Sequence, residues 1–144
     1  MAYGLNILTG GTASADTDQS GVHPASNAVD GNLTTYWASD GTEPHWWEYD
    51  LGAGVTKIVQ KCSIYRLDGY IIGFTIQGSN NGSAWDNLAT PTASAGNGWE
   101  DYMFVNQTAY RYYRLYFTVG NGGYNAAYEI QMFELLSIGF FQML

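Results

Sequence analysis

Apolar and polar residues alternate in short runs along most of the chain. In residues 46–51 the apolar side chains fall at every second position, at Trp47, Tyr49 and Leu51. A period of two is typical of a strand that is buried on one face only. Runs rich in aromatic and β-branched residues predict further strands at 5–8, 55–66, 71–79, 99–105, 109–119 and 127–136.

The alternation in residues 55–66 is less regular. Ile58, Cys62 and Ile64 fall on the expected core face, and Val59 falls on the opposite face. Gln60 lies among the apolar set, so the pattern specifies this register only weakly.

Turn residues separate the predicted strands. Asn80-Asn81-Gly82-Ser83 has the Asn-Gly signal of a hairpin, and 120–123 reads as a glycine-rich turn. Residues 9–23 and 86–98 are rich in small and polar residues and predict loops. Eight or so short strands without a long helical pattern predict an all-β, single-domain β-sandwich.

Composition narrows the possible partners. The chain has 144 residues, 12 of them tyrosine. Its 13 Asp and Glu residues outnumber its five Lys and Arg residues and give a net charge of −8. This charge argues against nucleic acid and anionic membrane as partners, since both bind basic residues, and leaves neutral or cationic ligands open.

The one cysteine, Cys62, rules out an intrachain disulfide and is interpreted as a small core residue. No apolar run reaches the roughly 18 residues of a membrane span.

Residues 24–39 bring several oxygen-bearing side chains together in sequence. Asp30, Asn32 and Thr35 supply a carboxylate, an amide and a hydroxyl, and Trp37 follows as a core anchor. Oxygen donors of these kinds suit a hard cation such as calcium. On spacing alone an ordinary turn with no ligand is favoured over a metal site, because Asp-Gly-Asn is a common turn sequence.

Several fragments in the same order resemble one family. The run Ala25-x-x-Ala28-x-Asp30-Gly31-x-x-x-Thr35-x-Trp37 resembles the signature of the discoidin, or coagulation factor 5/8 type C, superfamily, and most closely carbohydrate-binding module family 32. Residues 6–8, 46–52, 74–85 and 112–115 resemble other strands of that family, with Asn81 where Asp is usual. The resemblance covers roughly residues 4–136 and implies an eight-stranded antiparallel jelly roll over residues 1–136.

The same resemblance implies a structural calcium ion. In the family this segment holds calcium together with a Glu near the chain end, which Glu129 matches. The expected ligand set is Asn27, Asp30, Asn32, Thr35, Tyr128 and Glu129.

The resemblance also implies that loops at one end of the sandwich bind glycans. Arg66 stands where many family members carry a sugar-binding arginine. The other expected ligand-binding residues are His45, Tyr124, Trp46, Tyr70 and Asn125. The Asn that follows this arginine in galactose-binding relatives is not evident in Leu67-Asp68-Gly69-Tyr70, so the sugar is not specified.

Each of these residues also has a structural interpretation. Arg66 can pair at the surface with Asp68 or Glu48, and surface pairs contribute little. His45 can be a solvated loop residue, and Tyr124 can cover a sheet edge. Three tryptophans, Trp37, Trp47 and Trp85, are expected in the core because large aromatics supply much of a small domain's buried area.

Catalysis is disfavoured by the inventory of titratable residues. Only His23 and His45 are ordinary bases near neutral pH, and no nucleophile-base arrangement is suggested. Lipid binding, known in the clotting-factor relatives, is disfavoured by the acidic charge.

The last eight residues suggest an alternative function. Residues 137–144 carry no charged side chain and include two phenylalanines. This tail is predicted either to add an edge strand or to dock into a neighbouring subunit, as in a structural protein of a virion, phage tail or filament. No secretory signal is visible at the start, so an adhesion role predicts an extracellular or virion-surface location reached by another route.

Overall fold

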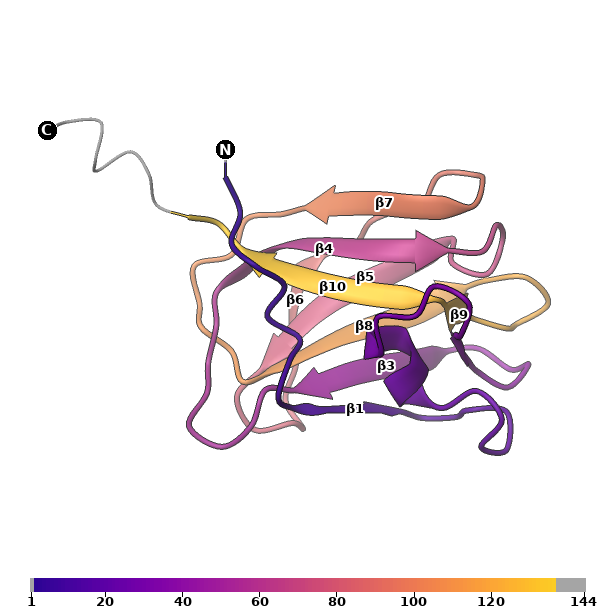
Figure 1. Ribbon diagram of the computed structural model, residues 1–144, viewed down its shortest axis with the longest axis horizontal. Coiled ribbons are helices and arrows are strands. Elements are labelled where there is room, and N and C mark those ends of the chain that lie inside the picture. Colours follow the sequence, from indigo (N-terminus) through magenta and orange to yellow (C-terminus); the bar gives the residue numbers. More distant parts are fainter. Residues whose placement is uncertain (1, 137–144) are drawn as a thin grey trace, which may run out of the picture.

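Antiparallel strands account for almost all regular structure in residues 2–136, the part of the chain that the computed structural model describes (Figure 1). Residues 25–29 form a short 3₁₀ helix, η1 (Ala25–Val29). Three sheets are present, and every strand pair in them is antiparallel. The all-β sandwich predicted from the sequence is therefore confirmed. No helix in the described residues is long and apolar enough to cross a membrane.

The largest sheet has five strands in the order β1-β3-β8-β5-β6. Their bounds are Thr12–Ala15 for β1, His45–Asp50 for β3, Tyr112–Val119 for β8, Gly73–Ser79 for β5 and Asp86–Ala89 for β6. A second sheet has the order β10-β4-β7, with bounds Glu129–Glu134, Val59–Arg66 and Gly98–Met103. A two-residue ladder pairs β2 (Trp37–Ala38) with β9 (Ala126–Ala127).

The core lies between the five-stranded and three-stranded sheets. Ile64 of β4 and Leu115 of β8 are fully buried in one apolar cluster. Trp37 packs against Phe117 with ring centroids 5.5 Å apart, and the Trp47 indole donates a hydrogen bond to the Ala25 carbonyl at 3.0 Å. Trp37, Trp47 and Cys62 are core residues, as predicted.

Two predicted element boundaries are wrong. Residues 5–8 form no named strand, whereas β1 forms at 12–15, inside the predicted loop. β1 reads Thr-Ala-Ser-Ala, in which only two small apolar residues, Ala13 and Ala15, face the core, and it forms because β3 offers an edge to pair with. The predicted loop at 86–98 likewise contains β6, which pairs with β5.

Two predicted side-chain positions also differ from the structure. Val59 is buried, not outward, because the pairing of β4 with β10 shifts between Phe133 and Glu134 and rotates the start of β4. Trp85 lies at the surface, half-buried, with the Arg114 guanidinium 4.1 Å from its ring centre. A cation-π contact holds it there instead of core packing. The predicted tail, residues 137–144, lies outside the described residues.

Candidate functional site

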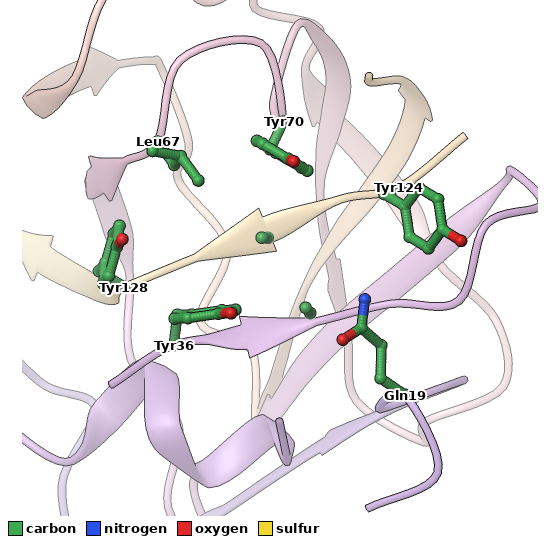
Figure 2. Close-up of a pocket in the computed structure, with 8 residues that line it drawn as sticks. Gln19, Tyr36, Leu67, Tyr70, Tyr124 and Tyr128 are labelled. Atoms are coloured by element: carbon green, nitrogen blue, oxygen red, sulfur yellow. The ribbon is translucent and has the colours of Figure 1, made fainter. Parts of the chain in front are cut away.

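A pocket of about 270 Å³ opens beside the ladder of β2 and β9. Four tyrosines surround it (Figure 2), from the segment before β2, the β4–β5 loop and both flanks of β9. The lining residues are Gln19, Tyr36, Ala38, Leu67, Tyr70, Tyr124, Ala126 and Tyr128. The pocket is therefore walled by aromatic rings that carry hydroxyl groups.

The floor of the pocket consists of small side chains. Ala38 and Ala126 face each other across the β2–β9 ladder. Their neighbours Trp37 and Ala127 point the other way, into the core. Side chains alternate along a strand, so Tyr36 and Tyr128 stand on the same side as the two floor alanines. The depth of the pocket depends on the small size of these alanines.

Tyr124 packs directly on the backbone of Gly41. A Cβ added at Gly41 would lie 2.7 Å from the Tyr124 Cζ, which is closer than nonbonded carbon atoms pack. Glycine at this position therefore allows the tyrosine ring to lie flat against the neighbouring loop.

Asn125 connects three loops behind the pocket. It is fully buried, and its side-chain Nδ2 donates a hydrogen bond to the Tyr70 carbonyl at 3.1 Å. Its backbone N–H donates to the Ser39 hydroxyl at 2.9 Å, and the Ser39 N–H donates to the Asn125 carbonyl at 2.8 Å. These bonds hold the segments of Tyr70 and Tyr124 at a defined separation, so the walls are prearranged.

A second group of polar residues surrounds the loop at Gly31. The Gly31 N–H lies 3.3 and 3.2 Å from the two carboxylate oxygens of Glu129. The Thr35 hydroxyl donates to the Asp30 carboxylate at 2.5 Å. Glu129 is only 4% exposed. Burial raises the pKa of its carboxyl to about 7; the Gly31 N–H lowers it and the nearby Asp30 carboxylate raises it further.

This group has the chemistry that a hard cation requires. It holds one buried carboxylate near another, with a hydroxyl beside them, and such oxygens are calcium ligands. The described residues contain no cluster of three or more His, Cys, Asp or Glu side chains suited to a metal, so neutral oxygens would have to complete the set. Of the predicted ligands, Asn27 donates its amide to the Tyr36 carbonyl and Tyr128 turns its ring into the pocket.

Comparison with known protein families decides the classification. Residues 27–115 match the family model of the NedA-like, galactose-binding domain, which is of the F5/8 type C kind. The chain belongs to this family. The resemblance seen in the sequence is thereby confirmed.

Solved structures agree with this F5/8 type C assignment. Chitosan-binding module 1 of a chitosanase/glucanase from Paenibacillus sp. IK-5 is 29% identical with a TM-score of 0.77, covering 90% of this chain and 98% of that one. The family 32 carbohydrate-binding module of NanJ from C. perfringens, solved with galactose, has a TM-score of 0.80 at 23% identity and covers 92% and 100%. No curated protein sequence matches the chain.

The F5/8 type C domain brings two of the predicted ligand-binding residues together. Tyr70 and Tyr124 both line the tyrosine pocket. Arg66 does not line it: the residue is 5% exposed, and its guanidinium donates to the Ser94 carbonyl at 2.5 Å and lies 3.8 Å from Glu100. The predicted alternative partners of Arg66, Asp68 and Glu48, are therefore wrong.

His45 and Trp46 also lie away from the tyrosine pocket. His45 is the first residue of β3 and only 2% exposed, so the solvated loop position considered for it is wrong. Its Nδ1 lies 2.8 Å from the Asp16 carboxylate. Trp46 is on the outer side of β3, opposite Tyr116 of β8.

Sequence reasoning missed Tyr36, Leu67 and Gln19 as pocket residues. One signal for Tyr36 was available, since a residue next to the core anchor Trp37 must face away from the core in a strand. Gln19 belongs to the turn before η1, with φ of 52°, and no pattern in the sequence marks it.

Replacing Gly41 with alanine tests the prearranged wall. Gly41→Ala should displace the Tyr124 ring and destabilise the domain by roughly 1–3 kcal/mol, the usual cost of overpacking. NMR shifts of the Tyr124 ring and urea unfolding measure these effects. Gly4→Ala is the control, since its nearest neighbouring atom is 3.6 Å away. Unchanged Tyr124 shifts in Gly41→Ala would contradict the packing described here.

Proposed function

We propose that this domain is a non-catalytic carbohydrate-binding module that takes a sugar in the tyrosine pocket. The observation that carries the proposal is the pocket itself, four tyrosines around an alanine floor in a member of a galactose-binding domain family. Structural relatives have been solved with galactose and with chitotriose.

The pocket chemistry suits a sugar ring. The C–H face of a pyranose is apolar and packs on an aromatic ring, while its rim of hydroxyls needs polar partners. Tyr36, Tyr70, Tyr124 and Tyr128 supply both, since each ring ends in a hydroxyl that donates and accepts. The Gln19 amide offers two further donors and an acceptor.

A binding role, not a catalytic one, fits the titratable residues of the described chain. His45 is buried and held by Asp16, and His23 stacks on Tyr36 with ring centroids 4.1 Å apart. The His45 Nδ1 lies 3.4 Å from the Thr17 hydroxyl, but neither histidine nor Thr17 lines the tyrosine pocket. The proposed site therefore recognises the sugar without reacting with it.

The charge of the chain favours neutral and amino sugars. A net charge of −8 repels uronic acids and attracts protonated glucosamine. The Paenibacillus relative at 29% identity is a chitosan-binding module. We propose that the domain acts outside the cell, where such polysaccharides occur, or at a virion surface that meets them.

Truncating Tyr124 tests sugar binding. The wild-type protein should bind a few sugars selectively on a glycan array that includes galactose and glucosamine oligomers. Tyr124→Ala should lose about tenfold in affinity or more, because the exposed aromatic wall is removed. Tyr116→Ala, on the outer side of β8, is the matched control and should bind as the wild type does. Absence of binding by the folded wild type would overturn the proposal.

We further propose that the loop at Gly31 binds a structural calcium ion. Asp30, Thr35 and Glu129 would hold it, and the cation would offset the repulsion between the two carboxylates. Two elements far apart in the chain, the segment before β2 and the start of β10, would thereby be linked. The ion would support the fold without contacting the sugar.

Urea unfolding with calcium and with chelator tests this site. Calcium at about 100 times its Kd should raise the free energy of unfolding by about 2.7 kcal/mol. Asp30→Asn should remove most of this gain. Asp40→Asn is the control, because the Asp40 carboxylate makes no hydrogen bond to the described residues. Equal calcium stabilisation of Asp30→Asn and wild type would place the ion elsewhere.

Assembly is the second candidate function. A groove of about 360 Å³ lies beside Leu136, the last described residue, with Leu5 and Val55 as exposed apolar walls. We propose that residues 137–144 of a second copy dock there. The apolar composition of those residues and the position of the groove support this.

Deleting residues 137–144 tests the assembly proposal. The full chain should sediment as an oligomer at micromolar concentration, and the deletion should sediment as a folded monomer. Sugar binding by the deletion should equal that of the full chain, since the tyrosine pocket is formed by other residues. An oligomer of unchanged size after deletion, or a monomeric full chain, would contradict the proposal.

A further inference from the structure

A second groove, of about 360 Å³, adjoins the tyrosine pocket. Its lining residues are Leu33, Thr34, Tyr65, Arg66, Leu67, Asn97 and Tyr128. Leu67 and Tyr128 line both the groove and the pocket. The pocket and the groove therefore adjoin at these two side chains.

Aromatic rings follow the same path. Tyr36 contacts Tyr128 with ring centroids 5.3 Å apart, Tyr128 contacts Tyr65 at 5.7 Å, and Tyr65 contacts Trp99 at 5.4 Å. We call these four residues the aromatic row. The row begins at the pocket and ends on the outer face of the three-stranded sheet, and each step is about the length of one sugar ring.

Packing of the core does not account for the far end of the row. Tyr65 of β4 and Trp99 of β7 are cross-strand neighbours on the face opposite the buried Ile64. Trp99 is 44% exposed. An exposed tryptophan at the end of a continuous aromatic surface is typical of a binding face.

The groove also contains polar side chains. Arg66 lines it but is only 5% exposed, and its guanidinium is held by the Ser94 carbonyl and by Glu100, 3.8 Å from its Nε. Asn97 accepts a hydrogen bond from the Asp68 N–H at 2.7 Å through its oxygen, which leaves its NH₂ group available. Donors beside aromatic faces are the combination that a glycan residue requires.

We propose that the groove and the aromatic row bind the further residues of a linear oligosaccharide of amino sugars whose first residue occupies the tyrosine pocket. This inference rests on the function proposed above and specifies its ligand class. The acidic chain complements protonated amino groups, and the groove shares Leu67 and Tyr128 with the pocket.

The experiment compares glucosamine with its β-linked tetramer by NMR titration. The variants are Trp99→Ala, Met103→Ala and Tyr124→Ala, with galactose as a second monosaccharide. Met103 is the matched control: it lies on the same face of β7, is 62% exposed and stands outside the row. Thermal unfolding checks that each variant is folded.

The tetramer should bind wild type about tenfold more tightly than the monomer. Trp99→Ala should remove most of this gain and leave monosaccharide binding unchanged, as truncation of an aromatic hot spot does. Met103→Ala should change neither. The indole N–H signal of Trp99, identified by its absence from Trp99→Ala, should move with the tetramer and stay fixed with the monomer.

Failure of this inference differs from failure of the proposed function. One outcome contradicts only the extended site: a monosaccharide binds and Tyr124→Ala weakens its binding, but the tetramer binds no more tightly than the monosaccharide, or Trp99→Ala leaves tetramer affinity unchanged. The proposal that the tyrosine pocket binds a sugar would then still stand. If neither sugar nor tetramer binds the folded wild type, both proposals are overturned. Equal losses in Trp99→Ala and Met103→Ala would indicate a general apolar contact and also overturn the extended site.

Discussion

The two-residue ladder between β2 and β9 is the contact on which the site depends. Its core side buries Trp37 and Ala127 completely, and its outer side presents Ala38 and Ala126 as the pocket floor. Burial of the tryptophan stabilises the pairing by about 1.5–3 kcal/mol or more, a large contribution for four residues. Because side chains alternate, the same pairing turns the flanking tyrosines towards the pocket.

The loop at Gly31 and the tyrosine pocket share their supports. Glu129, which accepts the Gly31 N–H, directly follows Tyr128, and the loop leads through Thr35 to Tyr36. A change in this contact therefore moves two walls of the pocket together. A cation bound at the loop at Gly31 would change sugar affinity only by changing the positions of Tyr36 and Tyr128. Its role would be structural, because it would not contact the sugar itself.

Local pattern and family resemblance predicted different parts of this molecule. The alternation of apolar and polar residues was sufficient to predict β3. Tyr70 and Tyr124, which line the pocket, were named as candidates because the family resemblance pointed to their loops. The burial of Arg66 follows from β4 continuing the inward series of Cys62 and Ile64, a signal that the alternation offered but that the resemblance to a sugar-binding arginine overrode. β1 depends mainly on long-range pairing, because the alternation of Ala13 and Ala15 is only a weak local signal, and Gln19 depends on an unusual backbone angle that leaves none.

The physics of the pocket also explains why binding would extend along the aromatic row. Asn125 and Gly41 fix the walls before any ligand arrives, so little ordering free energy is lost on binding. Affinity would then depend mainly on the aromatic area that the sugar covers, since few charged groups face the site. In the proposed complex, one sugar residue would cover only the pocket tyrosines. Each further residue placed over Tyr65 and Trp99 would add contact area without a second loss of translational freedom, so chain length would become the means of selecting the ligand.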